Sequence, residues 1–124
     1  MKRPLILLVD DDPDVLGVVD DYLAGIGYAV EACANGRCAL DRLSAENPGF
    51  DAAVIDWTLP DLPGRTVVRA FSARLPGRPI IITTGHGAEV LSDVADAAVA
   101  ATVLRKPFTM RALSMRLDAA LSKG

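Results

Sequence analysis

The chain has 124 residues, of which 51% are hydrophobic and 23% charged, a balance typical of one folded domain rather than a disordered tail or a fibre. Its 13 basic and 16 acidic residues give a net charge of -3, which argues against direct binding of DNA or RNA through the phosphate backbone. No apolar run approaches the ~20 residues that span a bilayer, and the run behind the basic start is too short for a signal peptide, so we expect a cytoplasmic protein without membrane contact.

Short apolar runs alternate with stretches of helical spacing along the chain. We expect strands at 5–9, 28–32, 52–55 and 79–83, and a weaker strand at 102–104. Helices are expected after each of them, with Asp12, Asn35 and Thr109 as N-caps of the first, second and last helix and an Ala-rich fourth helix over 90–98. Strict alternation predicts an α/β fold, a doubly wound five-stranded parallel sheet with helices on both faces, in a single domain over 1–124 with no output domain in this chain.

Polar residues follow four of the expected strands. In a parallel sheet the carboxyl ends of the strands meet at one edge, where ligands bind. The residues expected there are Asp10, Asp11 and Asp12 after the first strand, Asp56 after the third, Thr84 and Gly85 after the fourth, and Arg105 and Lys106 after the fifth. Carboxylates from two strand ends would repel one another, and a hard divalent cation such as Mg²⁺ would relieve that repulsion.

These residue types are suited to phosphoryl transfer. A lysine is a compact positive charge that suits a phosphate oxygen, and an aspartate carboxylate can act as the nucleophile and become an aspartyl-phosphate. The reaction needs positioning and neutralisation of charge more than it needs further covalent chemistry. The strand ends therefore predict a site that takes a phosphoryl group with the help of Mg²⁺.

Four motifs resemble those of the receiver domains of two-component response regulators, and the resemblance covers the whole chain. They are Val9-Asp10-Asp11-Asp12, Ile55-Asp56-Trp57-Thr58-Leu59-Pro60 with Gly64, Thr84-Gly85-His86-Gly87, and Lys106-Pro107-Phe108. The resemblance implies a flavodoxin-like strand order of 2-1-3-4-5. It also implies a cytoplasmic signal-transduction protein that acts in a phosphorelay.

Each motif carries an implied role. Asp56 would accept the phosphoryl group from a phosphohistidine of a sensor histidine kinase or phosphotransfer protein. Mg²⁺ would be held by Asp11, Asp56 and the backbone carbonyl of Thr58, with Asp10 acting largely through water. Lys106 would contact the phosphoryl oxygens, and its bond to Pro107 would be cis.

The signal would pass from the new phosphate to a second protein. Thr84 would hydrogen-bond the phosphoryl group, and Gly85 would leave room for it; Thr83 competes for the same role, but Thr84 matches the family spacing to Lys106. The face made by the fourth helix, fifth strand and fifth helix would contact a downstream protein target. Val103 and Val99 depart from the family pattern, since members often carry an aromatic residue and a glycine there, so the coupling of Thr84 to that face can differ.

Several alternatives remain open at this stage. The chain could be a degenerate receiver-like interaction module that takes no phosphate, or an aspartate-nucleophile phosphatase, although Thr58 stands where such phosphatases usually have a second acid. Any enzymatic activity would be limited to self-phosphorylation and dephosphorylation of the aspartyl-phosphate. His86 is expected to be a solvated loop residue, and Cys33 and Cys38 to be two small half-buried thiols.

Overall fold

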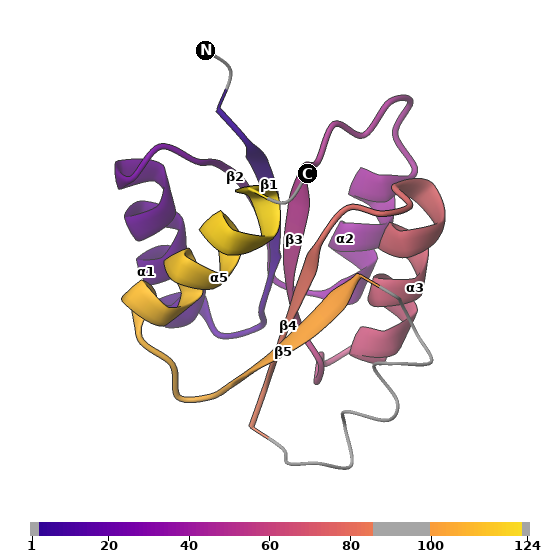
Figure 1. The fold of residues 1–124 in the computed structure, drawn as a ribbon. Coiled ribbons are helices and arrows are strands. Elements are labelled where there is room, and N and C mark those ends of the chain that lie inside the picture. The colour runs from indigo at the N-terminus through magenta and orange to yellow at the C-terminus, as the bar shows by residue number, and fades with distance from the viewer. Residues whose placement is uncertain (1–2, 86–99, 123–124) are drawn as a thin grey trace.

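The computed structural model describes residues 3–85 and 100–122. Five parallel strands form one sheet in the order β2-β1-β3-β4-β5 (Figure 1). The strands are β1 (Leu5–Val9), β2 (Ala29–Cys33), β3 (Ala52–Asp56), β4 (Ile80–Thr84) and β5 (Ala101–Arg105). The helices of the described residues are α1 (Pro13–Gly25), α2 (Gly36–Leu43), α3 (Gly64–Arg74) and α5 (Met110–Ser122). The predicted fold class and strand order are confirmed.

Helices cover both faces of the sheet. Helices α1 and α5 lie on one face, and α2 and α3 lie on the other (Figure 1). Side chains of alternate strand residues pack on opposite faces of the sheet. Leu7, Ile55 and Ile82 pack toward α2 and α3, whereas Ile6 and Leu8 pack toward α1 and α5. The three inner strands β1, β3 and β4 are therefore covered on both faces, which is why their sequences are mostly apolar.

Side-chain caps start three of the helices where the sequence predicts them. The side chain of Asp12 accepts a hydrogen bond from the Asp14 N–H, and Pro13 occupies the first turn of α1. Asn35 caps α2 by accepting from the Cys38 N–H, and Thr109 accepts from the Ala112 N–H at the start of α5. The Asp12 cap ends the loop after β1 at a defined residue and so sets the path of the loop that carries Asp10 and Asp11.

The observed strand boundaries differ from the predicted ones by about one residue. β2 runs from Ala29 to Cys33, β3 includes Asp56, and β4 includes Thr84. The predicted Ala-rich helix over 90–98, His86 and Val99 lie outside the described residues. Across the ranges 3–85 and 100–122, we find no helix with both the length and the apolar character needed to cross a membrane.

The expectation of two separate thiols is wrong. Cys33 and Cys38 form a disulfide, with a Cα–Cα distance of 5.6 Å. Cys33 is the last residue of β2, and Cys38 lies in the first turn of α2. The Asn35 cap turns the chain back between them, so two residues that are separated along an extended chain come into contact.

Candidate phosphoacceptor site

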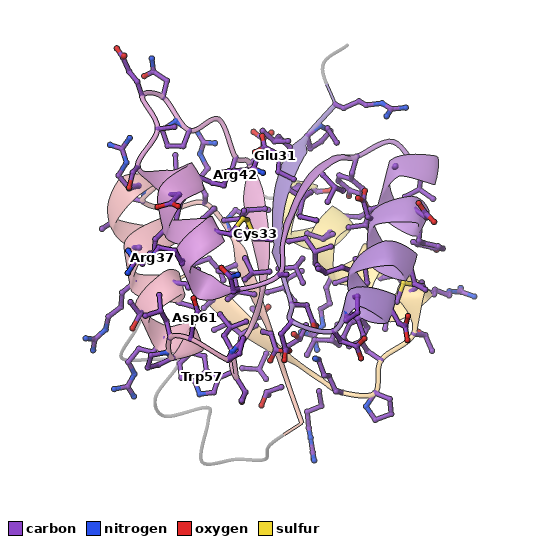
Figure 2. All side chains as sticks on the ribbon, turned by 180° about the vertical axis from the view of Figure 1, so that it is seen from behind. Glu31, Cys33, Arg37, Arg42, Trp57 and Asp61 are labelled. Carbon is purple, nitrogen blue, oxygen red and sulfur yellow. A yellow bond between two sulfur atoms is a disulfide. The ribbon has the colours of Figure 1, made fainter. Side chains whose placement is uncertain are left out.

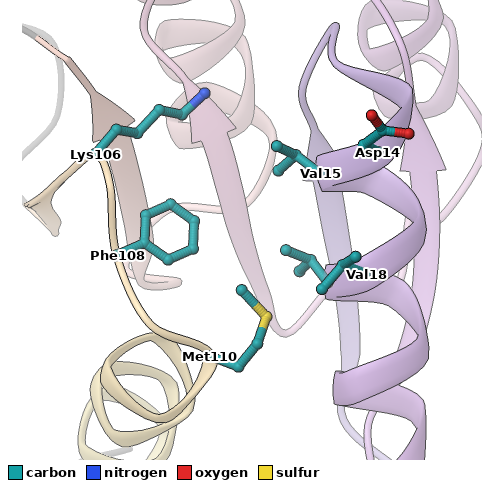
Figure 3. Close-up of a pocket in the computed structure, with 7 residues that line it drawn as sticks. Asp14, Val15, Val18, Lys106, Phe108 and Met110 are labelled. Atoms are coloured by element: carbon teal, nitrogen blue, oxygen red, sulfur yellow. The ribbon is translucent and has the colours of Figure 1, made fainter.

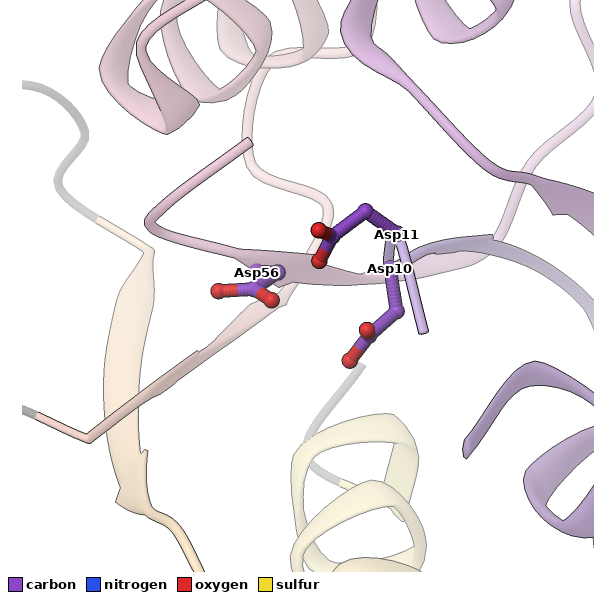
Figure 4. Close-up of side chains that lie close together, drawn as sticks. All are labelled: Asp10, Asp11 and Asp56. Carbon is purple, nitrogen blue, oxygen red and sulfur yellow. The ribbon is translucent and has the colours of Figure 1, made fainter. Parts of the chain in front are cut away.

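Three carboxylates converge at the carboxyl edge of the sheet. Asp10 and Asp11 follow β1, and Asp56 ends the adjacent strand β3, where Val9 pairs with Ile55. One oxygen from each carboxylate lies within 4.8 Å of the others (Figure 4). Asp10 and Asp56 are buried, whereas Asp11 is exposed. The predicted meeting of acids from two strand ends is present in the structure.

Lys106 joins the two buried acids. Its Nζ lies 3.0 Å from Asp10 Oδ2 and 3.0 Å from Asp56 Oδ2, so one ammonium group bridges the ends of β1 and β3. The lysine follows β5, and its backbone N–H donates to the Thr84 carbonyl over 2.8 Å. Its bond to Pro107 is cis, as the sequence resemblance implies.

Burial and neighbouring charges shift the pKa values of Asp56 and Lys106 in opposite directions. Burial raises the pKa of Asp56 above its ordinary 3.8, with a further rise from Asp10, while the Thr58 N–H and Lys106 act in the opposite direction. Burial alone would lower the pKa of Lys106, but its bonds to Asp10 and Asp56 raise it above 10.5. The lysine is therefore held as a cation between two carboxylates, which suits a site that must accept a further anionic group.

The loop after Asp56 is held by short backbone contacts. The Thr58 N–H donates to Asp56 Oδ1 over 3.0 Å and so orients the carboxylate. The Gly64 N–H donates to the Trp57 carbonyl over 3.0 Å, and a Cβ added at Gly64 would lie 2.4 Å from that oxygen and 2.6 Å from the Asp56 carbonyl oxygen. Only glycine allows the start of α3 to approach the end of β3 this closely.

Thr83 and Thr84 are both buried at the end of β4. Thr83 pairs with Asp56 in the sheet register, and its Oγ1 has no hydrogen-bond partner among the described residues. Thr84 lies beside Lys106 through the backbone hydrogen bond given above. A side-chain atom added at Gly85 would meet no described atom within 4 Å, which agrees with its expected role of leaving space.

The structure brings together Asp10, Asp11, Asp56 and Lys106, and places Thr58 next to them through its backbone. Asp12 caps α1, and its own N–H donates to Asp10 Oδ1 over 2.9 Å. Asp61 was not anticipated from the sequence. It belongs to the loop after β3 but accepts hydrogen bonds from the first N–H groups of α2, a long-range contact for which the local sequence carries no signal.

An open groove of about 270 Å³ lies between α1 and the start of α5, with Lys106 in its lining. Figure 3 shows Val15 and Val18 of α1 facing Phe108 and Met110 across it, with Lys106 at one end. The surface of the groove is mostly apolar, and Val18 is 56% exposed. Lys106 therefore belongs both to the acidic site and to a partly apolar surface beside it.

The donor set fits a hard divalent cation. All three converging side chains offer carboxylate oxygens, the ligand type that Mg²⁺ prefers, and no sulfur or imidazole group of the described residues takes part in the cluster. Asp11 is exposed and so leaves one side of the cluster open to water and to an incoming group. The acidic cluster could hold a metal of this kind.

Known proteins share this fold. The family model of the response regulator receiver domain matches residues 6–118. The chain belongs to this family. Among curated relatives, the response regulator receiver protein CpdR of Brucella abortus is 34% identical over 118 residues, which cover 95% of each chain. A CheY-like receiver domain from Methanospirillum hungatei has a TM-score of 0.89 and 29% identity, covering 98% of this chain and 96% of that one.

Receiver domains also occur within longer proteins. The DNA-binding transcriptional regulator NtrC of Escherichia coli is 31% identical over 128 residues, which are 98% of this chain and 26% of NtrC. The present receiver domain therefore spans about a quarter of that relative and nearly all of CpdR. The family is common to both, while the activities of the longer proteins lie beyond the matched part.

Proposed function

We propose that the chain is a phosphoacceptor switch of a two-component phosphorelay, in which Asp56 takes a phosphoryl group from a phosphohistidine of a sensor histidine kinase or phosphotransfer protein. The observation that carries this proposal is the convergence of Asp10, Asp11 and Asp56 with the Lys106 ammonium at one edge of the sheet. A module that takes no phosphate would not need these four groups in contact, and an aspartate-nucleophile phosphatase would usually have a second acid where Thr58 stands.

The residues that would hold Mg²⁺ are Asp11, Asp56 and the Thr58 carbonyl, with Asp10 acting through water. When bound, the ion supplies positive charge that offsets the carboxylates and the phosphoryl oxygens. The protein's part is to hold these oxygens in place: the Asp12 N–H fixes Asp10, and the Thr58 N–H fixes Asp56.

In the transfer step, an Asp56 carboxylate oxygen forms a bond to phosphorus as the bond from phosphorus to the imidazole nitrogen of the donor breaks. The Thr58 N–H donates to Oδ1 of Asp56, and Lys106 donates to Oδ2. Whichever oxygen bonds to phosphorus therefore gives up the hydrogen bond that it accepts. Lys106 contacts the phosphoryl oxygens, since its Nζ already lies beside Asp56 and it remains a cation. Gly85 leaves room for the phosphoryl group.

The response to phosphorylation would begin at Thr84. Its hydroxyl hydrogen-bonds the phosphoryl group, and the shift biases two conformations that already exchange. Val103 of β5 packs against the core on the α3 side, and Arg116 of α5 donates to its carbonyl over 3.0 Å. A displacement of β5 would therefore reach α5, and we propose that these elements, with the fourth helix of the predicted fold, form the face that a downstream protein contacts.

The phosphoryl donor would dock over the groove beside Lys106. The groove is continuous with the acidic site because Lys106 lines it, and its apolar side chains Val15 and Val18 belong to the helix that follows the acids. A V18D change should slow transfer from a sensor kinase that phosphorylates the wild-type chain, but leave phosphorylation by a small acyl phosphate unchanged. Slowing of both reactions to the same extent would contradict this docking surface.

Residues 1–124 would act as one receiver domain in the cytoplasm, and the only covalent chemistry would be formation and slow hydrolysis of the aspartyl-phosphate on Asp56. The gain or loss of that group is the signal. Binding to a partner protein, rather than turnover of a substrate, would be the output.

Beryllofluoride, which mimics an acyl phosphate, tests the proposal without a kinase. Addition of Mg²⁺ and beryllofluoride should shift the amide NMR signals of Thr84 and Lys106. The D56N variant, which keeps the size of the side chain, should show no such shifts. Absence of shifts in the wild type, or equal shifts in D56N, would overturn the proposed function.

A further inference from the structure

The Cys33–Cys38 disulfide lies between the sheet and α2 (Figure 2), and the Cys33 carbonyl accepts a hydrogen bond from the N–H of Asp10 in the phosphoacceptor site. It connects the end of β2 to the first turn of α2 and contains both cysteines of the chain. We propose that this pair is a reversible redox site, and that its oxidation state is transmitted to the loops that carry Asp10 and Asp56. The effect on phosphorylation rests on the proposed function, whereas the redox site itself does not.

A first connection runs from Cys33 to Asp10. The Asp10 N–H donates to the Cys33 carbonyl over 3.1 Å, so the residue that carries one sulfur also fixes the backbone of a buried acid. Cys33 is buried in the core between the sheet and α2. A change in the freedom of Cys33 therefore acts directly on the loop after β1.

A second connection runs from the start of α2 to the loop after β3. The Asp61 carboxylate accepts from the N–H groups of Gly36 and Arg37 over 2.8 and 2.9 Å, and Figure 2 shows Asp61 near Arg37 on this side of the molecule. A Cβ added at Gly36 would lie 3.0 Å from the Leu62 side chain, so the two segments are in close contact. The turn that the disulfide closes is thus tied to the loop that holds Asp56.

The two sulfurs differ in access. Cys33 is buried, while Cys38 is partly exposed at the helix start, so an external thiolate would attack the Cys38 sulfur. This forms a mixed disulfide and releases the Cys33 thiolate, which takes a proton. A second thiolate, from another glutathione or from the same molecule if the reductant is a dithiol, then attacks the reductant's sulfur of the mixed disulfide. The bond to Cys38 breaks, the Cys38 thiolate takes a proton, and the reductant leaves as its own disulfide. Two electrons pass from the reductant to the protein, and a small-molecule disulfide such as oxidised glutathione reverses the reaction.

Oxidation should strengthen the response to a phosphoryl mimic. The disulfide restricts the turn between β2 and α2, and through the Asp10 and Asp61 contacts it limits the motion of both acid loops. We expect the oxidised chain to reach half-saturation at a beryllofluoride concentration at least twofold lower than the reduced chain, at the same Mg²⁺ concentration.

The test uses the full chain equilibrated in glutathione buffers of different ratios, with the thiol state read by alkylation and intact mass. Interconversion between the two states, with shifts of the Asp10, Gly36 and Thr58 amide signals and none at Gly77 on the opposite edge of the sheet, supports the proposal. Failure of the pair to interconvert in any of these buffers, or interconversion with unchanged Asp10 and Thr58 signals, would overturn it.

Two variants test the exposed sulfur and the second connection separately. C38S removes the partly exposed sulfur, and its spectrum should match that of the reduced wild type in every buffer; a buffer-dependent spectrum would contradict the assignment. D61A keeps both cysteines but breaks the second connection, so the redox-dependent shift should disappear at Thr58 and remain at Asp10. Redox-dependent shifts without any response to beryllofluoride would support the redox site and overturn the proposed function instead.

Discussion

Replacement of Asp56 by asparagine should stabilise the fold when no metal is present. Asp56 is buried among two other carboxylates, and its raised pKa means that the ionised form costs folding free energy. Lys106 offsets part of this cost from 3.0 Å. The D56N variant keeps an oxygen for the Thr58 N–H and removes the charge.

The distances give the size of the effect. At an effective dielectric constant of about 20, the attraction of Lys106 at 3.0 Å is about 5.5 kcal/mol, and the repulsion from the buried Asp10, whose oxygen lies within 4.8 Å, is at least about 3.5 kcal/mol. The charges alone therefore favour the ionised carboxylate by about 2 kcal/mol, whereas burial of an ion costs several kcal/mol, so burial decides the sign and we expect the free energy of unfolding of D56N to be higher by about 1–2 kcal/mol. With a urea m value of about 1–3 kcal/mol/M, the midpoint should rise by about 0.5–1 M.

Urea unfolding at neutral pH in a metal chelator measures this change, and D21N, which removes an exposed charge on α1, is the matched control. The advantage of D56N should shrink as the pH falls below the raised pKa of Asp56 toward 3.8, because the wild-type carboxyl then takes up a proton in the folded state. Added Mg²⁺ should stabilise the wild type more than D56N. A D56N variant that is less stable than the wild type, or no more stable than D21N, would refute the reasoning.

Three further changes test separate parts of the site. G64A should lower the free energy of unfolding by about 1–3 kcal/mol, because the new methyl group meets backbone oxygens of the preceding loop, whereas G17A, in open space on α1, should raise it by about 0.5–1 kcal/mol in the same urea assay. K106A should still bind Mg²⁺ but take up phosphoryl groups from acetyl phosphate at least tenfold more slowly than the wild type, and equal rates measured by intact mass would exclude contact between Lys106 and the phosphoryl oxygens. T84A should abolish the beryllofluoride-dependent NMR shifts in β5 and T83A should keep them, and the reverse pattern would assign the switch to Thr83.

Local sequence signals account for the elements that position the site. The apolar runs, the Asp12 and Asn35 caps and the acid after β3 each depend on neighbouring residues, so the fold and the meeting of Asp10 with Asp56 could be predicted. The strand boundaries shifted by about one residue because pairing with adjacent strands, rather than local preference, decides where a strand ends.

One contact that escaped prediction joins segments far apart in the sequence, and the other depends on how the chain turns between two nearby residues. Asp61 reaches the start of α2 across 24 and 25 residues, and nothing near Pro60 or Pro63 indicates that partner. The pairing of Cys33 with Cys38 depends on the direction in which the chain turns at Asn35, which cysteine spacing alone does not determine. These contacts underlie the proposed link between the redox pair and the acids.

The location of the phosphoryl group tests the central claim most directly. After incubation with acetyl phosphate and Mg²⁺, intact mass and peptide mapping should find a single phosphoryl group on the peptide that contains Asp56, and D56N should gain none. A phosphoryl group on another residue, or equal uptake by D56N, would contradict the account.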